Sequence, residues 1–260
     1  MGRIIAVASG KGGTGKTTVT ANIGAALAQM GKLVVLMDMD MGLRNLDIAL
    51  GMENEIVYDI ADVIEGERSI DEVLLKDKKT ENLYFIPAPQ TRDASMIADK
   101  VPEHFWEKIK SRFDYCLIDC PAGIGGGLKI AADAADETLI VTVPEIAALR
   151  DADRAIDIFS QKDIRLIINR IRPDMMEEGL MVSVDYCMDI LSIPLLAIIP
   201  EDKELIISSL KNELAISNTT SKAGLALKNA ARRITGEEVP IMDFSHKKGF
   251  LDFIKKMFKR

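Results

Sequence analysis

A glycine-rich segment at residues 9–18, Ser-Gly-Lys-Gly-Gly-Thr-Gly-Lys-Thr-Thr, restricts the folds open to this chain more than any other stretch. It follows an apolar run at residues 4–8 and precedes a segment whose apolar residues have helical spacing. From Gly10 to Thr17 it fits the pattern G-x-x-x-x-G-K-[ST], and a strand before it and a helix after it are the context that this pattern needs. Glycines allow a tight turn in which successive N–H groups face an anion at the start of the helix. The sequence therefore predicts a phosphate-binding loop.

Two side chains of this loop have an assignable chemistry. Lys16 is expected to reach the β- and γ-phosphates of a nucleotide, and the Thr17 hydroxyl is expected to bind Mg²⁺. A glycine-rich turn that carries Lys16 and Thr17 by chance is the alternative, and it does not account for the flanking strand and helix. The predicted nucleotide-binding residues of the loop are Gly10, Lys11, Gly12, Gly13, Thr14, Gly15, Lys16, Thr17 and Thr18.

Lys11 is a second lysine that a phosphate site within one chain does not need. The run K-G-G-T-G-K-T-T at residues 11–18 resembles the deviant Walker A loop of the MinD/ParA ATPases. In that family the early lysine crosses a dimer interface to the partner's nucleotide. The resemblance therefore implies a homodimer in the ATP state, with ATP and Mg²⁺ as cofactors and with Lys11 and Lys16 in catalytic positions. A solvated loop lysine is the alternative for Lys11.

The composition indicates a single core. The 260 residues are 48% hydrophobic, which suffices for one sizeable domain. Short β-branched runs alternate with amphipathic stretches, so we expect an α/β class: a single-domain P-loop fold with a mostly parallel, twisted sheet flanked by helices and a C-terminal amphipathic helix. The expected divisions are an ATPase domain at 1–234, a linker at 235–246 and a membrane-targeting helix at 247–260. Three cysteines without a paired framework, and no apolar run of about 20 residues, favour a reduced compartment without secretion or membrane spanning.

Acidic residues follow two apolar runs that read as buried strands. Asp38 and Asp40 come after residues 33–37, and Asp119 ends the run at 115–118. Because α/β proteins place ligands at the carboxyl ends of their strands, these carboxylates are positioned near Mg²⁺ and the γ-phosphate. The resemblance implies that Asp40 orients the attacking water, that Asp38 lies near the metal and that Asp119 holds Mg²⁺ through its water shell. Solvated turn carboxylates are the alternative for Asp38 and Asp40.

A base site is expected from two later strand ends. Asn169, with Arg170 next to it, ends an apolar run, and an amide there can both donate to and accept from an adenine edge. Asn169 also matches the family's base-reading asparagine, and the resemblance places Pro200, Glu201 and Asp202 around the base, largely through backbone groups. The guanine-selective N-K-x-D pattern is absent from the sequence, which favours adenine.

Asp151 lies in a stretch that corresponds to the family's dimer interface and regulator sites. The resemblance makes it a candidate interface residue. An ordinary exposed helix face is the alternative, since charge runs are usually solvated.

The last 15 residues differ in charge from the rest of the chain. They carry six basic residues and one acidic residue, a net +5, which leaves −12 of the total −7 on the remainder. Their apolar residues fill one side of a helix, and we expect them to insert among anionic lipid headgroups, weakly alone and strongly as a pair on a dimer. A helix that packs against its own domain is the alternative. The predicted membrane residues are Phe250, Leu251, Phe253, Ile254, Met257 and Phe258.

The tail and the loop together resemble the septum-positioning members of the family. That resemblance implies a cytoplasmic protein that binds peripherally to the cytoplasmic face of the cell membrane, recruits the division inhibitor MinC and is regulated by MinE or another topological factor. The acidic body argues against nucleic acid as a partner. The alternatives are a flagellar-number regulator of the FlhG type, which normally carries an extra N-terminal segment, a DNA-segregating ATPase of the ParA/Soj type, and an adaptor that binds ATP without turnover.

Overall fold

The computed structural model describes residues 1–41, 43–90, 100–123, 126–160, 162–242 and 244. The strands in this part of the chain are β1 (Arg3–Ala8), β2 (Val34–Asp38), β3 (Leu75–Lys76), β4 (Leu83–Ile86), β5 (Tyr115–Asp119), β6 (Glu137–Thr142), β7 (Asp163–Ile171) and β8 (Leu195–Pro200). The helices are α1 (Lys16–Gln29), α2 (Leu46–Leu50), α3 (Ile60–Ile64), α4 (Ile70–Val73), α5 (Phe105–Arg112), α6 (Gly126–Ala134), α7 (Ile146–Ile158), α8 (Pro173–Glu177), α9 (Val184–Leu191), α10 (Lys203–Leu210), the 3₁₀ helix η3 (Ala215–Ser217) and α11 (Lys222–Ile234).

The strands form one sheet in the order β3-β4-β2-β5-β1-β6-β7-β8. All neighbouring pairs are parallel except β3 with β4, which is antiparallel and lies at one edge. Parallel sheets are covered on both faces, and this explains why the strands read as continuous apolar runs. The predicted α/β fold with a mostly parallel sheet is confirmed.

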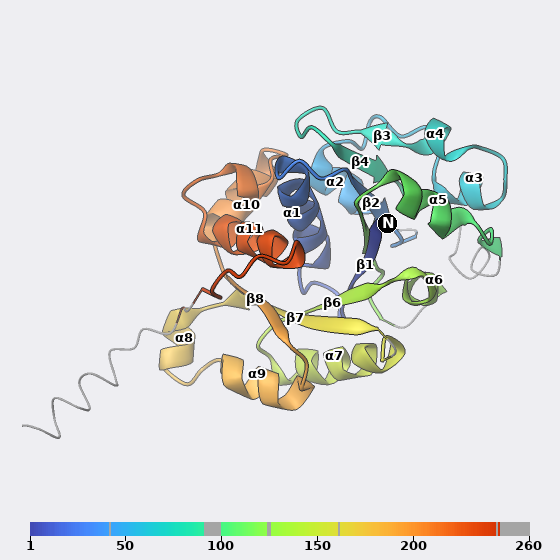
Figure 1. Ribbon diagram of the computed structural model, residues 1–260. Coiled ribbons are helices and arrows are strands. Elements are labelled where there is room, and N and C mark those ends of the chain that lie inside the picture. The colour runs from blue at the N-terminus through green and yellow to red at the C-terminus, as the bar shows by residue number, and fades with distance from the viewer. Residues whose placement is uncertain (42, 91–99, 124–125, 161, 243, 245–260) are drawn as a thin grey trace, which may run out of the picture.

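Helices cover both faces of the sheet (Figure 1). The hydrophobic core therefore has two layers, and β1 contributes residues to both. Ile5 and Val7 pack with residues of α1, α2 and α11, whereas Ile4, Ala6 and Ala8 pack with residues of α3, α5, α6, α7 and α9. Side chains of successive strand residues point to opposite faces, so one short strand supports both layers.

The central strands bring the predicted acidic residues to one edge of the sheet. In the pairing of β2 with β5, Asp38 is opposite Asp119, and in the pairing of β1 with β5, Val7 is opposite Asp119. The loop after β1 therefore starts beside both carboxylates, which is the ligand-binding edge expected of such a sheet.

The C-terminal expectations fall largely outside the described residues. Of the predicted linker, residues 235–242 and 244 are described, and the predicted membrane residues Phe250, Leu251, Phe253, Ile254, Met257 and Phe258 are not. The division into domain, linker and tail stays a prediction. Among the helices that the structure does describe, none is both long and apolar enough to cross a membrane.

Candidate functional site

The predicted phosphate-binding loop joins the end of β1 to the start of α1. Gly13 (φ 78°) and Gly15 (φ 94°) have left-handed backbone conformations, which residues with a Cβ rarely adopt. A Cβ at Gly15 would also lie 2.3 Å from Nδ2 of Asn169, so that amide would have to move to make room for it. The loop thus leads into the N-terminus of α1, where free N–H groups and the helix dipole favour an anion.

The start of the loop is packed directly on α7. A Cβ added to Gly10 would lie 1.8 Å from the carbonyl oxygen of Asp151, so only glycine allows this approach. The side chain of Asp151 lies 3.6 Å from Arg154 on the same helix. The structure therefore places Asp151 against the loop, while its role at a dimer or regulator interface stays a prediction.

Two hydroxyl groups of α1 face the carboxylate of Asp119. Thr17 Oγ1 donates a hydrogen bond to Asp119 Oδ2 at 2.7 Å, and Thr20 Oγ1 lies 3.0 Å from Asp119 Oδ1. The predicted pair Thr17 and Asp119 is thus brought together, and Thr20 is a neighbour that the sequence analysis missed. The sequence could have indicated Thr20, because it lies three residues after Thr17 and residues three apart lie on the same side of a helix.

Asp38 and Asp119 lie side by side and deeply buried, with 0% and 1% of their surface exposed. Burial, and then the negative charge of Asp119, raise the pKa of Asp38 to about 7, although two backbone N–H groups donate to its carboxylate. Burial likewise raises the pKa of Asp119 to about 6, against the opposing effects of Thr17, Lys16 and Thr20. Because two buried carboxylates disfavour each other's charged form, a cation beside them would lower the pKa of both.

This arrangement fits Mg²⁺. The donors are the carboxylate oxygens of Asp38 and Asp119 and the hydroxyl of Thr17, the hard oxygen ligands that Mg²⁺ prefers. Among the described residues no cluster of three or more His, Cys, Asp or Glu side chains is built to hold a metal ion. A Mg²⁺ that keeps several waters and uses few protein ligands does not require such a cluster.

Asp40 and Lys16 lie at the same edge. The backbone N–H of Asp40 donates to Asp38 Oδ1 at 2.8 Å, which fixes the turn after β2. Partial burial raises the pKa of the Asp40 carboxyl, and the charge of Lys16 opposes this rise. Lys16 itself is only 7% exposed, so its ammonium group acts on both Asp40 and Asp119 from a largely buried position.

The predicted base residues line one cavity of about 280 Å³ at the ends of β7 and β8. Asn169 Nδ2 donates to the carbonyl oxygen of Thr14 at 2.8 Å, and its Oδ1 accepts from the backbone N–H of Arg170 at 2.9 Å. The Asn169 amide is therefore already bonded to the phosphate-binding loop as well as facing the cavity. The lining residues are Gly15, Thr18, Asn169, Arg170, Pro200, Glu201, Asp202, Leu205 and Ile206.

Asp202 has a structural task in addition to its place at this cavity. Its Oδ1 accepts from Glu204 N at 2.9 Å and caps α10, while Oδ2 accepts from Ser221 Oγ at 2.8 Å and from Ala223 N at 3.0 Å. The side chain thus ties the start of α10 to the start of α11. That Asp202 contacts a base through its backbone stays a prediction.

Lys11 is exposed, and its ion pair is with a residue outside the phosphate-binding loop. Its Nζ lies 3.5 Å from Glu145 Oε2, an ion pair with both side chains largely in solvent. Lys11 also lines an open cavity of about 470 Å³ with Gly12, Gly13 and Thr14. Exposed pairs of this kind contribute little to stability, so Lys11 is free to exchange its partner.

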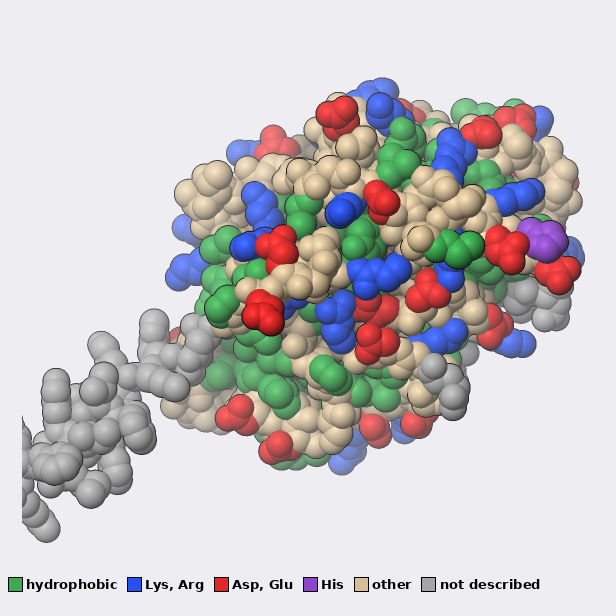
Figure 2. All heavy atoms as spheres, in the orientation of Figure 1, with side chains coloured by type: hydrophobic (Ala, Val, Ile, Leu, Met, Phe, Trp, Pro, Cys, Tyr) green, Lys and Arg blue, Asp and Glu red, His purple; other side chains and the backbone are tan. Residues whose placement is uncertain are grey.

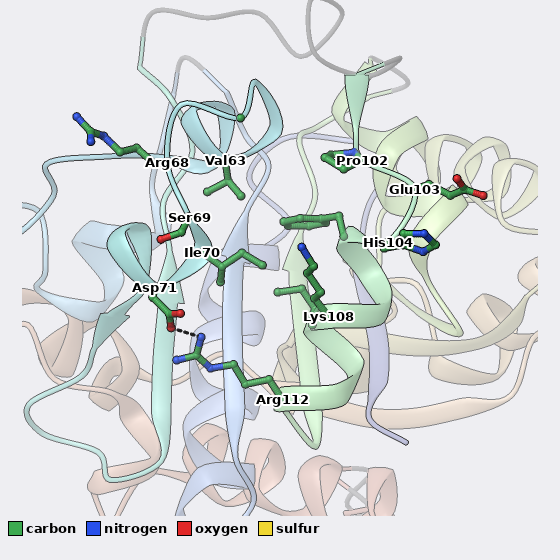
Figure 3. A pocket seen from close by; sticks show the side chains of 13 residues that line it. Val63, Arg68, Ser69, Ile70, Asp71, Pro102, Glu103, His104, Lys108 and Arg112 are labelled. Carbon is green, nitrogen blue, oxygen red and sulfur yellow. Dashed lines mark hydrogen bonds and ion pairs between the residues drawn. The ribbon is translucent and has the colours of Figure 1, made fainter.

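A larger cavity of about 530 Å³ lies away from this site, between α3, α4 and α5 (Figure 3). Ile70 and Val63 face it from one side, Lys108 lies on the other, and Arg112 pairs with Asp71 at its edge. None of the residues predicted to bind nucleotide lines it. Cavity size alone would therefore not point to the predicted nucleotide site.

Comparison with known proteins agrees with this geometry. Residues 2–174 match the family model described as an AAA domain. The septum site-determining protein MinD of Synechocystis sp. is 49% identical over 248 residues, which cover 94% of this chain and 93% of that protein. The MinC:MinD cell division protein complex of Aquifex aeolicus gives a TM-score of 0.84 at 41% identity and covers 94% of this chain and 100% of its own. Septum site-determining protein MinD complexed with Mg-ADP, from Pyrococcus horikoshii, gives a TM-score of 0.78 at 31% identity and covers 90% and 96%. The chain therefore belongs to the MinD family of septum site-determining proteins.

Proposed function

We propose that this chain is a Mg²⁺-dependent ATPase that forms a homodimer when it binds ATP, attaches to the cytoplasmic face of the cell membrane and positions the division septum by recruiting MinC. The observation that carries the ATPase part is the cluster of Thr17, Asp38 and Asp119 beside the glycine loop. It combines an anion-binding helix start with two buried carboxylates, an arrangement that suits a phosphate together with its Mg²⁺.

The residues of the site divide the work as follows. The loop amides and Lys16 bind and orient the phosphates, and Thr17, with Asp38 and Asp119 around it, holds Mg²⁺. Bound Mg²⁺ supplies positive charge to the phosphate oxygens. Asp40 orients a water and accepts its proton, a task suited to a half-buried carboxylate whose pKa lies above its usual range. Asn169 and the residues of the 280 Å³ cavity hold the adenine.

The dimer part of the proposal rests on Lys11. Its only ion pair in the described part of the chain is with an exposed glutamate, so its charge is available to a nucleotide in a second copy. Because a two-fold dimer uses each such contact twice, Lys11→Ala should weaken ATP-dependent dimerisation about 100-fold or more while monomeric ATP binding persists.

Analytical ultracentrifugation with ATP and with ADP checks this expectation. Lys32→Ala, at a partly exposed lysine after α1, is the control and should leave the dimer unchanged. An ATP-dependent dimer of normal affinity in Lys11→Ala would show that the lysine does not act across the interface.

Membrane attachment is proposed for the predicted tail. Two weak anchors on one dimer bind together more strongly than either alone. Phe253→Asp places a charge on the apolar side of both anchors, and we expect sedimentation with anionic vesicles in ATP to weaken on the order of 100-fold with ATPase turnover of the soluble protein unchanged. Wild-type and Phe253→Asp proteins that sediment equally would remove the membrane claim.

MinC is the partner proposed for the ATP-bound dimer, supported by the Aquifex aeolicus MinC:MinD complex. MinE or another topological regulator would stimulate hydrolysis and release the dimer. The flagellar-number and DNA-segregation alternatives are set aside, because the full-length relatives are septum site-determining proteins.

A further inference from the structure

A second apolar cavity lies at the β8 edge of the sheet and shares no lining residue with the nucleotide cavities. It has a volume of about 450 Å³. We call it the α8–α9 groove. Its walls come from β7, β8, α8, α9 and the last described residues of the chain, and its lining residues are Ile171, Met176, Ser183, Val184, Asp185, Met188, Leu195, Ile198, Ile241, Met242 and Phe244.

The groove has an acidic margin. Residues 173–200 contain five acidic residues and no lysine or arginine: Asp174, Glu177, Glu178, Asp185 and Asp189. Asp174 lies 3.6 Å from Arg172, whereas within the described ranges no lysine or arginine pairs with the other four. Hydrophobic side chains gather on the surface between α8, α9 and β8, with acidic side chains along α9 (Figure 2). The groove thus suits an apolar segment that carries positive charge.

The chain itself supplies such a segment at the right place. Phe244 forms part of the groove wall, and 16 residues follow it in the sequence. These residues carry six basic side chains against one acidic one, together with the apolar set from Phe250 to Phe258. Six extended residues reach about 20 Å, so the apolar set can return to the groove that the chain has just lined.

We propose that the α8–α9 groove binds the apolar side of residues 250–258 of the same chain, so that groove and lipid compete for one segment. The competition rests on the membrane attachment proposed above, whereas the docking itself does not. A segment exposed for only a tenth of the time binds lipid about tenfold more weakly in apparent terms. Docking would thus lower the membrane affinity of a lone chain before dimerisation pairs the two tails.

A disulfide experiment tests the docking without lipid or nucleotide. Met188→Cys, on the 36% exposed methionine of α9, is combined with Phe253→Cys in the full chain. The native cysteines, Cys116, Cys120 and Cys187, are buried, so mild oxidation reports on the introduced pair. We expect a disulfide within one chain, seen as a monomer of altered mobility on a non-reducing gel.

The control places the first cysteine on α11, which packs on the other face of the sheet. Leu225→Cys, at a residue 50% exposed, with Phe253→Cys should form at least tenfold less intrachain disulfide. A disulfide between two copies of Met188→Cys/Phe253→Cys would assign the groove to a second chain and overturn docking in cis. Equal yields in the two double variants would overturn the groove as the binding site.

Vesicle binding supplies an independent measurement. Met188→Gln removes an apolar contact without adding charge, and it should raise binding of the nucleotide-free chain to anionic vesicles by up to about tenfold. Leu225→Gln should not change it. Unchanged binding in Met188→Gln would refute the competition. Should Phe253→Asp leave vesicle binding intact, the membrane proposal fails while the disulfide yields still decide the docking.

Discussion

The two halves of the nucleotide site differ in how complete they are without a ligand. At the base end, both polar atoms of the Asn169 side chain are hydrogen-bonded, and so are both oxygens of Asp202. At the phosphate end, Asp38 and Asp119 face one another in a buried position, and the buried Thr14 Oγ1 has no partner among the described residues. The base end is thus assembled by the fold alone, whereas the phosphate end is assembled by fold and ligand together.

This difference indicates which end of the site gains more stability when Mg²⁺ and nucleotide bind. Buried carboxylates that are not paired with a cation oppose folding, since burial disfavours their charged form. A cation that binds there is attracted to both carboxylates, so magnesium and nucleotide should stabilise the chain far more through the phosphate end than through the base end. Anything that binds only the folded state raises its stability in this way.

The largest expected effect lies at the phosphate end. Asp40→Ala removes the carboxylate assigned to the attacking water, and turnover should fall about 100- to 10,000-fold. ATP binding and dimerisation should persist, so the variant accumulates as an ATP-bound dimer. Phosphate release at steady state and ultracentrifugation measure the two effects. Asp153→Ala, at an exposed aspartate of α7, is the control, and full turnover in Asp40→Ala would overturn the assignment.

A second effect concerns pH and the chain free of Mg²⁺ and nucleotide. The pKa of Asp38 is raised from 3.8 to about 7, so the folded state binds a proton between these values that the unfolded state releases. Stability should therefore fall as pH rises through this window, by at most about 1.4 kcal/mol per pH unit for this group.

Asp38→Asn removes that titration, so the free energy of unfolding should change less between pH 5 and pH 7 than in the wild type. Urea unfolding at the two pH values measures it, with Asp153→Asn as the control. Identical pH slopes in wild type and Asp38→Asn would contradict the raised pKa.

The smallest effect tests the base end. Asp202→Ala removes the cap of α10 and the link to α11, and it should cost about 1–2 kcal/mol of unfolding free energy even without nucleotide. Glu201→Ala, next to it, loses only a surface ion pair with Arg172 at 3.3 Å and should cost under about 1 kcal/mol. Urea unfolding of both variants compares them, and equal costs would show that Asp202 has no such structural role.

The sequence predicted the part of the site that lies close together along the chain or at strand ends. Gly10, Lys16 and Thr17 belong to one loop, and Asp38 and Asp119 had to meet because parallel strands end at the same edge. The short strand Leu75–Lys76 could not be predicted, since two residues have no periodicity.

Contacts between distant segments were also beyond the sequence. Asn169 bonds to Thr14 from 155 positions away, and Asp202 reaches Ser221 and Ala223 from the other side of α10 and a 3₁₀ helix in the sequence. Thr20 meets Asp119 only because α1 packs over β5. Such pairings depend on how the helices pack on the sheet. The residue pattern within one segment does not predict that packing.

At Gly10 the backbone of the phosphate-binding loop packs directly against the carbonyl of Asp151 on α7. No side chain lies between loop and helix to absorb a displacement. A protein that binds the outer side of α7 and displaces this helix would therefore press directly on the start of the phosphate-binding loop. The contact at Gly10 is thus a direct route from the surface of α7 to the nucleotide site.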